Sequence, residues 1–147
     1  MRKILLLLLL SLSLLGHAQS AIQMRIGYGE GTGLSFGAGL ESNLRRNLTG
    51  RLYLDLSPAS PGLAIGGDLL FKPDLGRYDP SLRGLFPYFG GGLSGLLASE
   101  STFGVGFSLG LEGLLDPYTG LFLEGQYVYG FANAPKTGRI LLGVNFR

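Results

Sequence analysis

Outside its first 18 residues, the chain contains neither histidine nor cysteine. The only histidine is His17, and the composition holds no cysteine at all. Without these residues the chain cannot assemble a Ser-His-acid triad, a Cys-His pair or a zinc site of ordinary ligands. We therefore predict that the protein is not an enzyme, and we predict no metal and no other cofactor.

Two other patterns could carry chemistry. Glu112 and Glu124 could pair as carboxylates for acid and base catalysis, and Gly90, Gly92 and Gly95 match the GxGxxG motif of phosphate-binding loops. That motif needs a helix directly after it to present its N-terminus to the phosphate, and residues 96–102 show no helical period. We therefore interpret these glycines as strand glycines, and the glutamates as members of the larger charged set described next.

Charged side chains recur at alternate positions throughout the chain. Successive side chains of a strand point to opposite faces, so these charges share one face of the predicted sheet. Four are basic and five acidic, and because an unpaired buried charge is costly we expect them to form a structural ion-pair network inside a barrel. The alternative is a water-filled path in which the same groups select solutes. The predicted set is Arg25, Glu41, Arg51, Asp55, Asp68, Lys72, Glu112, Glu124 and Arg139.

Eight alternating segments position these charges: 22–29, 33–41, 48–57, 63–72, 85–97, 103–112, 119–131 and 139–147. The fifth is the least regular, because it holds Pro87 and three successive glycines. Segments seven and eight alternate most clearly, and both carry aromatic residues near their ends, as lipid-facing barrel strands do. In these two we predict the following lipid-facing side chains: Leu121, Leu123, Tyr127, Tyr129, Ile140, Leu142, Val144 and Phe146.

The direction of the apolar face separates a soluble barrel from a membrane barrel. Pointing inward, the many large apolar side chains would overfill the lumen of eight strands and leave an outer coat of glycine and scattered charge. Pointing outward, they form a belt against lipid, with aromatic girdles near the strand ends. We therefore predict an all-β fold, an antiparallel up-and-down transmembrane β-barrel of eight strands. The expected girdle residues are Tyr28, Tyr118, Tyr127, Tyr129, Phe131 and Phe146.

Residues 1–18 have the pattern of a cleaved secretory signal peptide, and the barrel domain is predicted over 19–147. Arg2 and Lys3 precede an apolar run, and small residues end at Ala18. A transmembrane anchor would need about 20 apolar residues, more than this run offers. The full chain has 12 basic and 10 acidic residues; without Arg2 and Lys3 the remainder has ten of each, so no nucleic-acid partner is expected.

Three runs give the chain a family resemblance: PYFGGGLSG at 87–95, LEGQYVYGF at 123–131 and ILLGVNF at 140–146. With the alternating segments, they resemble the small outer-membrane β-barrel proteins of bacteria, the group of outer-membrane protein X and the membrane domain of outer-membrane protein A. The resemblance implies residence in outer-membrane lipid, export by the Sec translocon, insertion by the barrel assembly machinery and two periplasmic termini. We also expect a monomer.

Two features depart from that family. Its members usually end on an aromatic residue, whereas here Phe146 is followed by Arg147. The longest connection, 73–84, would lie on the periplasmic side, so either one strand is miscounted or the external loops are short.

The resemblance does not fix the task, since one fold serves many functions. We expect a structural or interaction role in the cell envelope. The alternatives are a narrow porin or small-solute channel, a lipid-modifying enzyme barrel, which in known families uses a histidine, and a secreted soluble barrel that binds a ligand.

Overall fold

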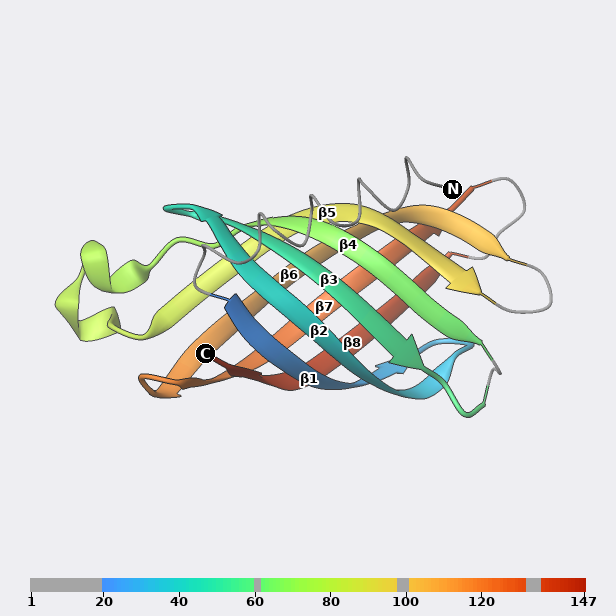
Figure 1. The fold of residues 1–147 in the computed structure, drawn as a ribbon, viewed down its shortest axis with the longest axis horizontal. Coiled ribbons are helices and arrows are strands. Elements are labelled where there is room, and N and C mark those ends of the chain that lie inside the picture. Colours follow the sequence, from blue (N-terminus) through green and yellow to red (C-terminus); the bar gives the residue numbers. More distant parts are fainter. Residues whose placement is uncertain (1–19, 60–61, 98–100, 132–135) are drawn as a thin grey trace, which may run out of the picture.

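The eight alternating segments form eight strands that close into one antiparallel barrel (Figure 1). The computed structural model describes residues 20–59, 62–97, 101–131 and 136–147, so the predicted signal peptide lies outside the described residues. Each strand pairs with its neighbours in the chain, and β1 closes the barrel against β8 with Ile22 opposite Phe146. The predicted fold class is confirmed. The strands are β1 (Ser20–Gly29), β2 (Gly33–Arg45), β3 (Leu48–Leu56), β4 (Leu63–Phe71), β5 (Leu85–Leu97), β6 (Thr102–Asp116), β7 (Thr119–Gly130) and β8 (Thr137–Phe146).

The irregular fifth segment is a full strand in spite of its proline. Phe89 is the first β5 residue that pairs with β4, opposite Phe71, so Pro87 lies beyond the end of β4 and pairs only with Leu111 of β6. A proline at such a position is tolerated because it has a sheet neighbour on one side only.

The two ends of the barrel differ in their connections. The connection 72–84 contains two short 3₁₀ helices, η1 (Leu75–Arg77) and η2 (Pro80–Leu82), and projects from the end at which β8 finishes (Figure 1). At the opposite end, only three to six residues separate the strands within each of the pairs β1–β2, β3–β4, β5–β6 and β7–β8. Since all eight strands are present, the possibility of a miscounted strand is wrong. In the described ranges, no helix is long and apolar enough to cross a membrane.

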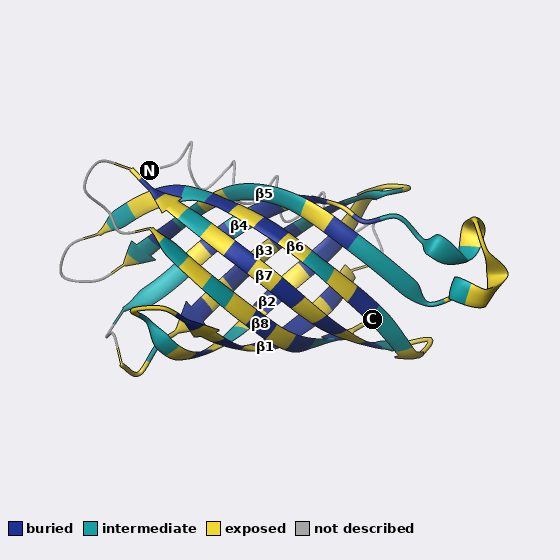
Figure 2. Ribbon diagram, turned by 180° about the vertical axis from the view of Figure 1, so that it is seen from behind, coloured by how far each residue is buried: buried dark blue, intermediate teal, exposed yellow. Residues whose placement is uncertain are grey.

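The barrel has its apolar residues outside and its charged residues inside, and Figure 2 shows the resulting alternation of exposed and buried positions along each strand. Leu109 is 69 % exposed and Leu123 is 56 % exposed, whereas Arg51 is 2 % exposed. Of the eight side chains expected to face lipid, seven are exposed and Val144 is half-buried. All six expected girdle aromatics are exposed. A soluble barrel would require the opposite arrangement.

Interior glycines make room for the largest interior side chains. A methyl group on Gly66 would overlap the ring of Tyr53, one on Gly110 would overlap the ring of Tyr88, and one on Gly143 would overlap the ring of Phe122. In each case the aromatic ring covers a glycine on the neighbouring strand. The glycines do not all face the lumen, however, because Gly125 and Gly138 are exposed on the outer surface.

Candidate functional site

The structure places all nine predicted network residues in the lumen, and each of them forms at least one ion pair with another member. Eight of the nine are buried, and Arg139 is half-buried. The ion pairs fall into three clusters along the barrel axis, which we call the middle, mouth and terminal clusters.

The middle cluster is centred on Arg51 of β3. Its guanidinium donates to Asp68 Oδ2 from Nη2 at 2.5 Å and to Glu124 Oε1 at 2.9 Å, and a second nitrogen also pairs with Glu124. Glu124 belongs to β7, four strands away from β3 in either direction around the barrel. The Arg51–Glu124 pair therefore crosses the full width of the lumen. Ser108 accepts a further hydrogen bond from Arg51 at 3.1 Å, and Tyr88 Oη donates to Glu124 at 2.9 Å.

The mouth cluster lies toward the end of the barrel at which β1 ends and β8 begins. Arg25 of β1 holds Asp55 of β3 with two hydrogen bonds of 2.6 and 2.5 Å. Arg139 of β8 approaches the same carboxylate, with Nη1 at 2.7 Å from Oδ2, and donates from Nε to Gln126 at 2.6 Å. The Arg25 guanidinium also lies 4.0 Å from the centre of the Tyr53 ring, a favourable cation–π geometry. Two arginines thus share one carboxylate here.

The terminal cluster closes the other end of the lumen. Lys72 pairs with Glu41 at 2.7 Å and also with Glu112, and Glu112 accepts from Arg147 Nη2 at 2.5 Å. Asn145 Nδ2 donates to Glu112 at 3.0 Å. Arg147 is absent from the predicted network, yet it lies on the same parity as Asn145. The predicted alternation of segment 139–147 already places it on that parity.

Four large apolar side chains lie in the lumen although none was predicted there: Leu70, Tyr88, Phe122 and Leu141. All four occupy the inward parity of their strands, so their positions predict inward-pointing side chains. Their apolar character predicted the opposite, because apolar residues were assigned to the lipid face.

The structure shows what surrounds the two motifs that could carry chemistry. Glu112 and Glu124 belong to different clusters, the terminal and the middle one, where each is bound by basic side chains. Gly90, Gly92 and Gly95 all lie within β5 and pair with residues of both neighbouring strands. Among the described residues, no three of His, Cys, Asp and Glu are grouped in a way that could hold a metal ion.

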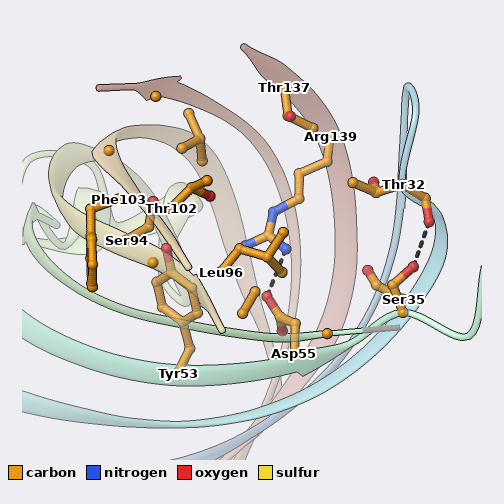
Figure 3. A pocket seen from close by; sticks show the side chains of 17 residues that line it. Thr32, Ser35, Tyr53, Asp55, Ser94, Leu96, Thr102, Phe103, Thr137 and Arg139 are labelled. Atoms are coloured by element: carbon orange, nitrogen blue, oxygen red, sulfur yellow. Dashed lines mark hydrogen bonds and ion pairs between the residues drawn. The ribbon is translucent and has the colours of Figure 1, made fainter. Parts of the chain in front are cut away.

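Two cavities flank the network. The mouth cavity, of about 120 Å³, lies beside Tyr53, Asp55 and Arg139 of the lumen, and Figure 3 shows the side chains that line it. The terminal cavity, of about 320 Å³, is lined by charged residues that include Lys72 and Arg147. The middle cluster lies between them. Two buried atoms of the network, Asp68 Oδ1 in the middle cluster and Arg25 Nη1 in the mouth cluster, lack a hydrogen-bond partner in the described part of the chain.

No protein-family model matches the sequence, and no curated protein matches it significantly. Solved structures do match the fold. The N-terminal β-barrel domain of Pseudomonas aeruginosa OprF aligns with a TM-score of 0.68 at 15% identity, covering 88% of this chain and 98% of that one. A de novo designed transmembrane β-barrel gives 0.62 at 16%, covering 86% and 92%, and Neisserial surface protein A (NspA) gives 0.62 at 14%, covering 86% and 94%. The chain therefore has the fold of the eight-stranded outer-membrane barrels.

Proposed function

We propose that the protein is an integral outer-membrane barrel with a structural or interaction role in the cell envelope and without catalytic activity. The observation that carries this proposal is the inverted distribution of side chains, with a leucine-rich exposed face around a lumen filled by ion pairs. Such a face is stable in lipid and would be costly in water. The fold shared with OprF and NspA supports the same location.

The ion pairs favour a plugged barrel over a channel. Arg51 and Glu124 meet across the whole lumen, and the Tyr53 hydroxyl accepts from Gln126 of the opposite strand at 3.3 Å. A solute would have to displace buried charges from their partners, and removing one partner of a buried pair costs about 3–5 kcal/mol. We therefore expect purified protein in planar bilayers to give no single-channel conductance. Discrete openings would favour the narrow-pore alternative.

Biogenesis follows from the same proposal. Residues 1–18 would direct export through the Sec translocon, the barrel assembly machinery would insert residues 19–147 as a monomer, and both termini would face the periplasm. In that orientation the η1–η2 connection is periplasmic and the external connections are the short ones. Short external connections argue against a large adhesive surface.

The test compares two substitutions on the outer face in a heat-modifiability assay. Leu123, 56 % exposed, lies within β7, and Leu115, 67 % exposed, lies at the end of β6 next to its turn. An arginine on the lipid face costs about 2–4 kcal/mol at the bilayer midplane and 0–1 near the interface. Leu123→Arg should therefore abolish or strongly reduce the compact form seen in unboiled outer-membrane samples, whereas Leu115→Arg should retain it. Equal recovery of both variants, or wild-type protein in the soluble fraction, would refute membrane insertion.

A further inference from the structure

The mouth cavity combines apolar walls with a basic floor. Leu96 of β5 and Val128 of β7, together with Ala64 of β4, provide apolar wall surface, and hydroxyl side chains such as Ser94 provide polar wall surface. At the floor, Arg139 reaches from β8 toward Asp55, as Figure 3 shows. The cavity volume of about 120 Å³ limits an occupant to a small molecule.

The charges around this floor do not cancel. The mouth cluster contains two arginines, Arg25 and Arg139, and a single carboxylate, Asp55, so it carries one excess positive charge. Buried Nη1 of Arg25 has no hydrogen-bond partner in the described ranges. The Arg139 side chain is 11 % exposed, so it is the member of the cluster that is accessible from the cavity. An excess charge at the base of an apolar cavity is strengthened by the low local polarizability and favours an anion.

We propose that the mouth cavity is a binding site for a small amphiphile with one anionic head group and a compact apolar body. The head group lies against Arg139, and the apolar body packs between Leu96, Ala64 and Val128. Hydroxyl groups on the walls, Ser94 among them, bind the remaining oxygen atoms of the head group. The site goes beyond the proposed structural role, and it requires no passage through the barrel, because the middle cluster closes the lumen beneath it.

The probe is benzoate, and its neutral isostere benzamide is the matched control ligand. Both carry one ring, so they differ mainly in the charge that Arg139 would recognise. The full barrel is reconstituted in lipid nanodiscs, its fold is verified by the heat-dependent mobility shift, and the amide resonances of Leu96 and Val128 are followed by NMR during titration. We expect saturable shifts with benzoate and at least about tenfold weaker binding of benzamide, since hydrogen bonds to charged groups contribute more than those to neutral ones.

Two variants assign the binding to the cavity, with a third as control. Arg139→Gln should weaken benzoate binding at least about tenfold, and Asp55 keeps Arg25 as a partner in this variant. Ser94→Leu fills the cavity with apolar volume and should abolish binding of both ligands, which preserves the test if Arg139→Gln fails to fold. Arg83→Gln, at an exposed arginine beyond the other end of the barrel, should bind benzoate as the wild type does. Equal affinity for the two ligands, or unchanged binding in Ser94→Leu, would overturn the site.

Discussion

Removing the Arg51 side-chain charge should destabilise the barrel more than any other single change in the network. Arg51→Met keeps a long apolar stem but leaves Asp68 and Glu124 buried without their guanidinium. The Arg51, Asp68 and Glu124 side chains are all 0 % exposed, so water cannot replace the lost partner. Loss of one partner from a buried pair costs about 3–5 kcal/mol. Two carboxylates are stranded here, and we expect a loss near the upper end of that range, a change of roughly several thousandfold in the unfolding constant.

The assay is reversible urea unfolding of the barrel in lipid vesicles, with the folded fraction read from the mobility of unboiled samples. The control is Arg77→Gln, which breaks the Arg77–Asp74 pair of the η1 segment. That pair spans 3.5 Å, its side chains are 44 % and 31 % exposed, and exposed pairs contribute about 0–1 kcal/mol. Arg77→Gln should therefore shift the unfolding midpoint little.

A rescue variant separates stranded charge from lost packing. In the triple variant Arg51→Met, Asp68→Asn and Glu124→Gln, the cluster is neutral, and neutral replacement of buried ion pairs is often nearly neutral in stability. The triple variant should recover about half or more of the loss. If Arg51→Met is as stable as the wild type, the middle cluster does not support the barrel; if the triple variant is no better than Arg51→Met, the loss reflects shape and not charge.

Two further predictions concern a pair of interior glycines and the η1–η2 connection. Gly66→Ala should destabilise the barrel in the same urea assay because the added methyl overlaps the Tyr53 ring, whereas Gly106→Ala should be tolerated because its methyl would meet no atom closer than 3.9 Å; equal effects would contradict the packing. A hydrogen bond from the Ser81 backbone to Asp79 lowers the pKa of Asp79 below its ordinary 3.8. The ionised carboxylate of Asp79 accepts this bond, so the bond is present above the pKa of Asp79 in the folded protein and is lost as the pH falls through that pKa. The Ser81 amide resonance should therefore titrate with a midpoint below 3.8. A midpoint at or above 3.8 would exclude the bond.

The strand number and the faces of the strands were predictable because both depend on local alternation. A side chain on the charged parity, such as Asp68 or Glu124, has to point into the barrel once the apolar parity faces lipid. The same alternation places Arg147 on the parity of Arg139 and Asn145, and its side chain reaches Glu112 at the end of the lumen. Local alternation thus predicts which side of the wall a residue occupies.

The pairing inside the lumen could not be predicted in this way. Arg51 meets Glu124 across the barrel, 73 residues further along the chain, and that meeting depends on how far neighbouring strands are staggered. The interior ring of Phe122 likewise depends on Gly143 of the adjacent strand, over which the ring lies. A sequence read one strand at a time shows an apolar exception at Phe122 and a glycine at 143, but not that one accommodates the other.

The stability of the barrel and its affinity for benzoate at the mouth should respond differently to the same substitutions. The reason is that positive and negative charges cancel over the whole lumen but not within each cluster. The middle cluster holds one arginine and two carboxylates, an excess of one negative charge, opposite to that of the mouth cluster. Arg51→Met makes the middle more negative and should weaken benzoate binding, although Arg51 does not line the mouth cavity. The triple variant removes the excess negative charge and should bind benzoate at least as tightly as the wild type. Charges separated by poorly hydrated protein are weakly screened, so this order should survive added salt. If benzoate affinity instead follows the order of stability, with the triple variant below the wild type, the excess charge of the mouth cluster is not what attracts the anion.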